Sequence, residues 1–350
     1  MVRLNERQKN IAEFIKEKGI VASHEISLFL GGKEKAISRT TLVRDLNELL
    51  ELGEIRQIGK GRNISYEHRT RHPLLGDIVV EEYFSPENRN KTRMQVSFNY
   101  ETIDKLNNIL SEKEITNLES KNEQYKKRII GLSSTLLKKE FERITIELSW
   151  KSSQIEGNTY SLIDTEILIK EHIEAKGHSK EEASMILNHK KALDYIFLNK
   201  EIFRTLTLSE IENVHRLLVE DLDVSTGIRM RAVGITGSHY RPLDNNLELK
   251  KVLKKTIEKI NSVSDPWSKA LIAFSMIAYI QPFEDGNKRT SRIIANACLI
   301  AHDVCPLSLR SIDITEYKKA MMIFYEVQNI SYIKQLFLEQ FDFAVNNYFL

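Results

Sequence analysis

The 350-residue chain is poor in the residues that mark secreted, membrane-spanning or low-complexity proteins. Its two cysteines, Cys298 and Cys305, are too few for a disulfide framework and lack the spacing of a zinc site. No apolar run approaches the length of a membrane span, and residues 1–9 lack the apolar core of a secretion signal. Only 14 glycines and 6 prolines interrupt the chain. We therefore expect a cytoplasmic protein built mainly from regular helices.

The charges are nearly balanced, with 51 Lys and Arg against 49 Asp and Glu and a formal net charge of +2. The chain as a whole is therefore not directed at a polyanion. A hydrophobic content of 41% is enough for a sizeable core, and the length predicts two or three domains. We expect the divisions at residues 1–66, 67–130 and 131–350.

Residues 1–66 are expected to form a winged helix-turn-helix, an α+β domain of three short helices and a hairpin around a Gly-Lys-Gly turn. Basic residues outnumber acidic ones here. The third helix and the turn would present polar and basic side chains to duplex DNA, namely Arg39, Thr40, Thr41, Arg44, Lys60 and Arg62. The alternative is a protein-contact or dimerisation module with solvated charges, which would make the protein a homo-oligomer.

Residues 67–130 are expected to be a linker and a helical arm without assigned chemistry. From residue 131 onward, apolar residues at helical spacing predict a helical bundle. Ser179 with Glu182 is a capping box that predicts one helix start, and Asp265 followed by Pro266 predicts another. The second of these helices is apolar almost all round, which predicts a central, buried position.

The most informative segment follows that helix directly, and it reads Gln281-Pro-Phe-Glu-Asp-Gly-Asn-Lys-Arg-Thr-Ser-Arg292. The spacing predicts a turn and then a helix whose first turns carry Lys288, Arg289 and Arg292. Guanidinium groups and the unpaired backbone N–H groups of a helix N-terminus bind phosphates. Asp285 would hold a Mg²⁺ ion that bridges such phosphates. The simpler alternative is a solvated, basic helix start.

This segment resembles the signature of the Fic (Fido) family, His-x-Phe-x-(Asp/Glu)-Gly-Asn-(Gly/Lys)-Arg-x-x-Arg, at every specified position except the first. Two further segments add to the resemblance. Residues 152–157, Ser-Ser-Gln-Ile-Glu-Gly, resemble the family's inhibitory motif, and residues 229–242 resemble its flap. The resemblance covers about residues 130–345. It implies a mainly α Fic bundle with a β-hairpin flap, an inhibitory helix at about 137–157, and the winged helix in front.

The resemblance implies protein adenylylation, the transfer of AMP from ATP to a hydroxyl group of a target protein that the sequence does not identify. ATP and Mg²⁺ would be required, with Mg²⁺ on Asp285. The phosphates would be held by Gly286, Asn287, Lys288, Arg289 and Arg292, the last at the γ-phosphate. The flap residues Val233 and Ile235 would pair with the target as an added strand.

The inhibitory motif suggests a switch. Ser152 and Glu156 are four residues apart and share one helix face, and Gly157 ends the helix. The carboxylate of Glu156 would pair with Arg292 and take it away from the γ-phosphate. ATP would then bind in a non-productive pose.

Gln281 departs from the family pattern, because the family's histidine deprotonates the target hydroxyl and a carboxamide does not titrate. Three explanations stay open. The chain is a natural nucleotide-binding pseudoenzyme, an active variant with another base such as His239 on the flap, or an engineered inactive form. His215 is expected to pack in the core.

Two functions therefore remain. The first is a Fic-type nucleotidyltransferase that is auto-inhibited by Glu156 and weakened or silenced by Gln281. The second is a non-catalytic ATP-binding regulator that acts through the winged helix on DNA or on a protein. The Doc toxins, a phosphotransferase branch of the family, also have a lysine at the position of Lys288. Phosphoryl transfer therefore stays a minor alternative.

Overall fold

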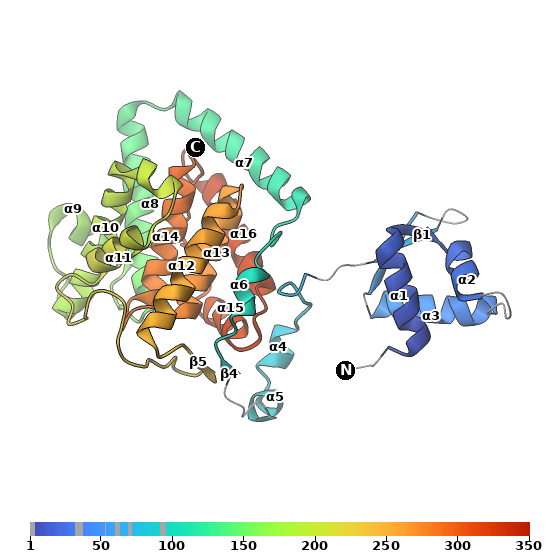
Figure 1. Ribbon diagram of the computed structural model, residues 1–350. Coiled ribbons are helices and arrows are strands. Elements are labelled where there is room, and N and C mark those ends of the chain that lie inside the picture. The colour runs from blue at the N-terminus through green and yellow to red at the C-terminus, as the bar shows by residue number, and fades with distance from the viewer. Residues whose placement is uncertain (1–3, 32–37, 53, 60–63, 69–71, 92–95) are drawn as a thin grey trace. The chain divides into compact units, whose positions relative to one another are not determined.

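The computed structural model describes residues 4–31, 38–52, 54–59, 64–68, 72–91 and 96–350 (Figure 1). The chain divides into two compact units, Met1–His72 and Pro73–Leu350. Within the described ranges, no helix is long and apolar enough to cross a membrane. The finer divisions expected at residues 66 and 130 stay predictions.

The first unit has three helices and a three-stranded sheet. Its elements are α1 (Glu6–Lys18), β1 (Ile20–Ala22), α2 (Ser23–Gly31), α3 (Arg39–Glu51), β2 (Ile55–Ile58) and β3 (Ser65–His68). β3 is the central strand and pairs antiparallel with both neighbours, so that Glu67 lies opposite Ile20 on one side and Arg56 on the other. The three helices and the β2–β3 pair agree with the sequence-based expectation, whereas β1 is an additional strand. The winged-helix assignment stays a prediction.

The DNA-contact candidates lie at the start of α3. Ser38 caps this helix, and its hydroxyl accepts from the backbone N–H of Thr41 and also bonds the Thr41 hydroxyl. Arg39, Thr40 and Arg44 are exposed, and Thr41 is half-buried. Lys60 and Arg62 lie outside the described residues. DNA contact by this surface stays a prediction.

The second unit is mainly helical, as expected. It begins with an arm of short elements, α4 (Val80–Tyr83), α5 (Pro86–Lys91), β4 (Val96–Ser97) and α6 (Glu101–Asp104), and continues into α7 (Glu112–Gly131). The bundle then contains α8 (Ser134–Ile155), α9 (Leu162–Glu171), α10 (Lys180–Leu198), the 3₁₀ helix η2 (Lys200–Arg204), α11 (Leu208–Leu218), α12 (Asn246–Ser262), α13 (Pro266–Ile280), α14 (Asn287–Ala301), α15 (Ile314–Val327) and α16 (Ser331–Asn347).

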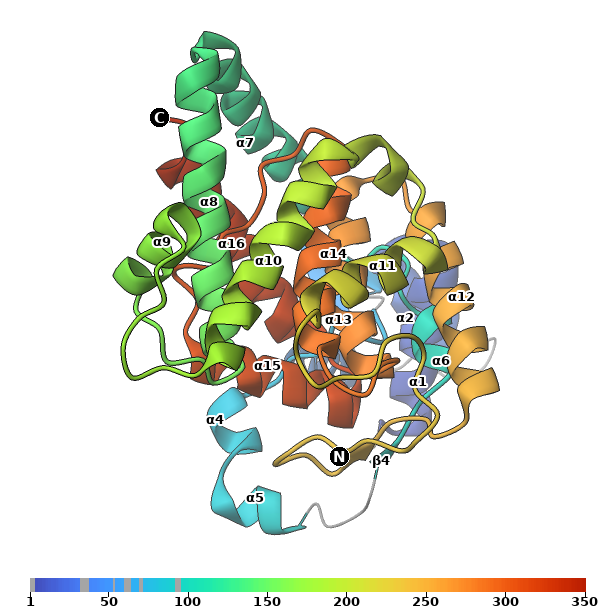
Figure 2. The same ribbon diagram turned by 90° about the vertical axis from the view of Figure 1, so that its left-hand side faces the viewer.

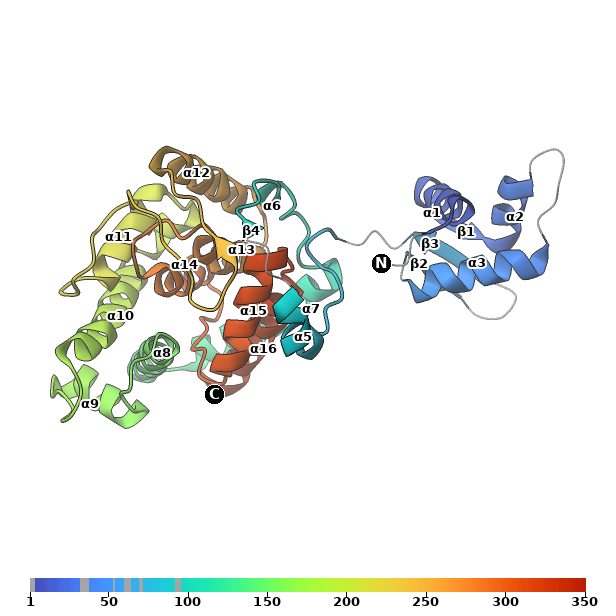
Figure 3. The same ribbon diagram turned by 90° about the horizontal axis from the view of Figure 1, so that it is seen from below.

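α13 and α14 form the centre of this bundle. Figures 2 and 3 show them surrounded by α8, α10, α11, α12 and α15. Every residue from Trp267 to Ile280 is buried, which confirms the expected central position of α13. Asp265 caps this helix through the backbone N–H of Ser268 at 2.7 Å, and Pro266 occupies its first turn. Residues 281–286 connect these two helices, so the candidate phosphate-binding motif lies where the central helix pair turns.

The segment 229–242 differs from the expected hairpin. Among the described residues it contains one short strand, β5 (Tyr240–Arg241), whose partner is β4 in parallel, with Val96 opposite Tyr240. The buried side chain of Arg229 donates to carbonyl groups of this region. Arg229 donates through Nη1 to Arg231 O at 2.6 Å and through Nη2 to Leu243 O. These carbonyl groups are therefore satisfied without the ladder of a hairpin.

Candidate active site

Arg292 on α14 is fully buried, and three side chains hold its guanidinium group. Nε donates to Ser152 Oγ at 2.8 Å, and Nη2 donates to the Ser152 carbonyl oxygen at 3.0 Å. Nη1 donates to Tyr317 Oη at 3.1 Å. Glu156 completes the set, with Oε1 at 2.8 Å from Nη2. The structure thus brings Ser152 and Glu156, from the segment that resembles the inhibitory motif, onto one arginine of the candidate phosphate-binding motif.

Glu156 lies at the C-terminal end of α8, and Gly157 follows it with a φ of 101°. Burial alone would raise the pKa of Glu156, but the positive charges of Arg292 and Lys288 outweigh burial and hold that pKa below its usual range. Lys288 Nζ lies 3.7 Å from Glu156 Oε2. The carboxylate is therefore ionised near neutral pH and faces two cations.

Asn287 braces the turn between α13 and α14. Its Oδ1 accepts from the backbone N–H of Phe283 at 2.8 Å, and its Nδ2 donates to the Phe283 carbonyl at 2.9 Å. The amide side chain is thus committed to the loop, and the backbone N–H remains as the group that Asn287 offers to an anion. Because Asn287, Lys288 and Arg289 begin the helix, their N–H groups have no intrahelical acceptor.

Gly286 and His215 also stabilise the turn between α13 and α14. Gly286 has a φ of 78°, and a Cβ atom there would lie 3.1 Å from Val219 Cγ1. The His215 ring stacks on Phe283 with 3.7 Å between ring centroids, and its Nε2 donates to the Asp285 carbonyl at 3.0 Å. Burial lowers the pKa of His215 to about 4, so the ring is neutral near pH 7. His215 is fully buried, in line with its expected place in the core.

Gln281 ends α13 in the left-handed conformation, with φ of 52°. Its Nε2 donates to the Ala278 carbonyl at 2.6 Å, and its Oε1 accepts from Asn287 Nδ2 at 3.1 Å. Both polar atoms of the carboxamide are therefore engaged within the loop. His239, the alternative base suggested by the sequence, donates its backbone N–H to Glu326 at 2.9 Å.

Arg289 and Asp285 form an ion pair at the mouth of the loop, with 3.0 Å between Nη2 and Oδ2. The Asp285 side chain is 70% exposed, whereas Arg289 is buried and also points Nη1 toward the Leu218 carbonyl at 3.5 Å. In the described part of the chain, no group of three or more His, Cys, Asp or Glu residues could enclose a metal. The exposed carboxylate of Asp285 would serve Mg²⁺ as a single protein ligand, and this role stays a prediction.

The flap candidates Val233 and Ile235 are half-buried and lie outside any strand. Ile235 packs against the main core. Arg229 joins this segment to the motif, because its Nε donates to the Gln281 carbonyl at 2.7 Å. Sequence reasoning assigned no role to Arg229 or Tyr317. The contacts that give them one join segments far apart in the chain, and no local pattern indicates such contacts.

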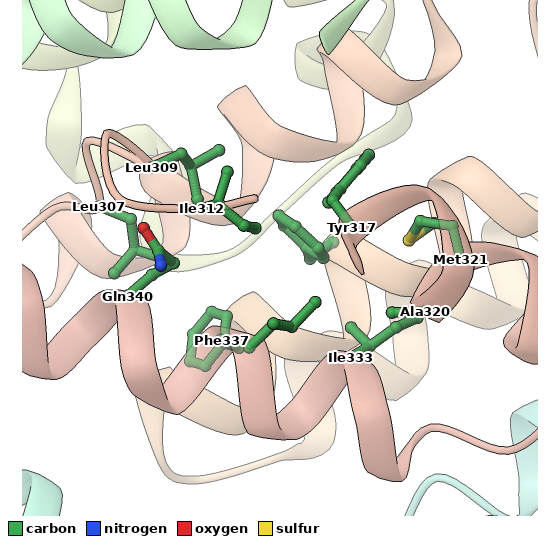
Figure 4. A pocket seen from close by; sticks show the side chains of 11 residues that line it. Leu307, Leu309, Ile312, Tyr317, Ala320, Met321, Ile333, Phe337 and Gln340 are labelled. Atoms are coloured by element: carbon green, nitrogen blue, oxygen red, sulfur yellow. The ribbon is translucent and has the colours of Figure 1, made fainter. Parts of the chain in front are cut away.

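Tyr317 also lines a small apolar cavity in the core (Figure 4). Its volume is about 10 Å³, and Ile312, Met321 and Phe337 are among its lining residues. A cavity of this size holds at most one water molecule and, when apolar, stays dry. It is a packing defect in the core and is far too small for a nucleotide.

Comparison with known proteins gives a consistent assignment. Residues 205–299 match the model of the Fic/DOC family. The protein adenylyltransferase Fic of Drosophila mojavensis is 25% identical over 239 residues, which cover 67% of this chain and 46% of that protein. The protein adenylyltransferase Fic of Aedes aegypti is 30% identical over 183 residues, which cover 50% and 36%. The chain thus spans about half the length, or less, of these relatives.

Two solved structures share the fold. A Fic domain-containing signaling protein from Bacteroides thetaiotaomicron VPI-5482 matches with a TM-score of 0.54 and 21% identity, over 67% of this chain and 96% of that chain. Fic-1 from C. elegans matches with a TM-score of 0.56 and 14% identity, over 98% of both chains. At such identities the likeness concerns the fold alone. Residues 205–299 are therefore similar in sequence to the Fic/DOC family, and the fold is similar to that of these Fic proteins.

Proposed function

We propose that the second unit binds ATP and is a Fic-type protein adenylyltransferase, held inactive by Glu156 and weakened by Gln281. The observation that carries this proposal is the 2.8 Å ion pair between Glu156 and Arg292, immediately behind the N-terminus of α14. In this pair, Arg292 of the segment that resembles the family signature is bound by the carboxylate of the segment that resembles the inhibitory motif. The names of the relatives, protein adenylyltransferases, support the same activity.

The phosphates of ATP would lie over the N-terminus of α14. Its first backbone N–H groups point at the ligand, and the helix dipole favours negative charge there. Lys288 is partly exposed and would add a positive charge. Arg292 would take the γ-phosphate once Glu156 leaves it. Arg289 would position the carboxylate of Asp285, with which it forms an ion pair. Mg²⁺ bound to Asp285 would neutralise part of the phosphate charge.

AMP transfer requires an oxygen atom of the target hydroxyl to attack the α-phosphorus, while the bond to the departing pyrophosphate breaks. The hydroxyl proton must pass to a base. The carboxamide of Gln281 accepts no proton and already uses both polar atoms within the loop. Loss of a general base lowers a rate by about 10²–10⁴-fold. ATP binding is therefore expected to persist in this chain while transfer is slow.

The test is transfer of label from [α-³²P]ATP to protein, in a lysate and on the purified chain. We expect weak or no labelling for the chain itself, more for Gln281→His, and most for Gln281→His with Glu156→Gly. Gln281→Ala is the matched control, because it changes the same position without adding a base. Absence of labelling by both histidine variants, in folded protein that binds ATP, would exclude adenylylation.

The hydrogen-bonded carboxamide of Gln281 also favours the second candidate, a non-catalytic ATP-binding regulator. Such a regulator would act through the first unit on DNA or on a protein partner, which could be a second copy of this chain. This candidate predicts ATP binding without transfer even in Gln281→His. Label from [γ-³²P]ATP, but not from [α-³²P]ATP, would instead indicate phosphoryl transfer. Binding of duplex DNA that falls steeply with salt would identify the first unit's partner as DNA.

A further inference from the structure

His189 on α10 is fully buried and touches the helix that carries Glu156. Its Nδ1 lies 2.8 Å from the Met185 carbonyl oxygen, and its Nε2 lies 2.8 Å from Ser152 Oγ. A second hydroxyl, Ser153 Oγ, is farther from Nδ1 at 3.4 Å. A carbonyl oxygen can only accept a hydrogen bond, so Nδ1 carries the proton. In the neutral ring Nε2 is then an acceptor, and the Ser152 hydroxyl donates to it.

The direction of this bond determines what Ser152 offers to Arg292. With its proton directed at His189, the Ser152 oxygen can present only lone pairs elsewhere. Arg292 Nε, which can only donate, lies 2.8 Å from that oxygen. The three hydrogen bonds thus run in one direction. Arg292 donates to Ser152, Ser152 donates to His189, and His189 donates to the Met185 carbonyl.

We propose that His189 is a positioning residue that orients Ser152 and thereby holds Arg292 on the inhibitory helix, away from ATP. This inference rests on the proposed function, because it assumes that Arg292 serves the γ-phosphate. It adds α10 to the inhibitory device, which the sequence motif confines to α8. The hydrogen bond from Arg292 to the Ser152 hydroxyl then adds to the ion pair with Glu156 in holding Arg292 on this helix.

The surroundings of His189 keep its ring in the required neutral form. Burial is the largest influence, the charges of Arg289 and Arg292 act in the same direction, and Glu156 and the Met185 carbonyl oppose them. The balance lowers the pKa of His189 to about 3. Nε2 therefore remains an acceptor for Ser152 at any pH near neutrality.

Two substitutions separate the role of the acceptor from that of the ring. The side-chain oxygen of His189→Gln reaches about as far as Nε2 and can accept from Ser152. His189→Asn is shorter, keeps a donor for the Met185 carbonyl, and removes the acceptor. We expect His189→Asn to tighten Mg²⁺-ATP binding about 3–10-fold by isothermal titration calorimetry, which corresponds to one hydrogen bond. His189→Gln should stay within about twofold of the parent chain.

Ser152→Ala should tighten ATP binding like His189→Asn, and Glu156→Gly should tighten it as well. If Glu156→Gly does so but His189→Asn and Ser152→Ala do not, the positioning role is refuted while the proposed function stands. If no variant binds ATP, the proposed function fails and the inhibitory role fails with it. Ring ¹⁵N chemical shifts of the unmodified chain give an independent readout. A protonated Nε2 at neutral pH would overturn the proposal, and an unprotonated Nε2 supports it.

Discussion

Oε1 of Glu156 lies 2.8 Å from Nη2 of Arg292, and the two partners differ in their access to solvent. The arginine side chain is 0% exposed, whereas that of the glutamate is 19% exposed. A buried charge that loses its partner is costly, so Arg292 needs an anion beside it at all times. A phosphate group arriving from solvent could replace the more accessible carboxylate. The two anions would then compete for one guanidinium group.

Replacement of Glu156 by glycine is expected to have opposite effects on stability and on ligand binding. Without ATP, the buried charge of Arg292 loses its partner, and the free energy of unfolding should fall by about 3–5 kcal/mol. With Mg²⁺-ATP, the phosphate supplies the missing charge and should restore much of this loss. Urea denaturation with and without ATP measures both effects. Equal losses in the two conditions would show that ATP does not reach Arg292.

The hydroxyl group of Tyr317 is expected to contribute to stability through Arg292. Tyr317→Phe leaves Nη1 of the buried guanidinium without this acceptor, which should cost about 1–3 kcal/mol of unfolding free energy in urea denaturation. Tyr325 on the same helix is the matched control. It is buried too, but its hydroxyl bonds no partner in the described part of the chain. Tyr325→Phe should therefore be neutral or slightly stabilising, and an equal loss in both variants would contradict the assignment.

Gly286→Ala is expected to distort the turn that we propose binds phosphate. Gly286 has a φ of 78°, which costs an L-residue about 1–2 kcal/mol, and the new Cβ would lie 3.1 Å from Val219 Cγ1. We expect lower stability and at least tenfold weaker ATP binding, because the N-terminus of α14 must shift. Gly131→Ala is the control, since nothing lies within 4 Å of a Cβ there and its φ is not positive. A Gly286→Ala chain that binds ATP normally would exclude this turn as the phosphate site.

The stability of the second unit should depend on His189 at mildly acidic pH. Its pKa of about 3 in the folded chain lies below the value of about 6.5 expected after unfolding. The unfolded state therefore binds more protons between these values, and stability is lost as pH falls from 6.5 toward 3. His189→Gln, which does not titrate, should make this decline shallower by up to ~1.4 kcal/mol per pH unit. An unchanged slope in pH-dependent urea denaturation would contradict the neutral, buried imidazole.

Local signals in the sequence predict much of the bundle. The capping box of Ser179 and Glu182 and the pair Asp265 and Pro266 mark the starts of α10 and α13, and the structure confirms both. The turn at Gly286 and the helix after it were likewise expected from adjacent residues. Such features could be predicted because caps, prolines and glycines act within one or two turns of the chain.

Contacts between distant segments could not be predicted in this way. β1 has three residues, too few to show an alternation, and it forms by pairing with β3. In residues 229–242 the strand β5 pairs with β4 from far earlier in the chain, and the buried guanidinium of Arg229 donates to a carbonyl on the loop after α13. His189 and Tyr317 gain their roles only when α10 and α15 pack around Arg292. No spacing of residues indicates which buried polar groups will meet.

The glutamine at position 281 is one base change away from the histidine of the family signature. Glutamine and histidine codons differ in their third base only, so a single transversion would restore the family's histidine. The backbone at this position is already left-handed and is braced by Asn287 and Arg229, so the new side chain would enter a turn that is already built. If Gln281 is the natural residue, loss of the base is therefore a step that one base change could reverse for as long as the turn itself is maintained.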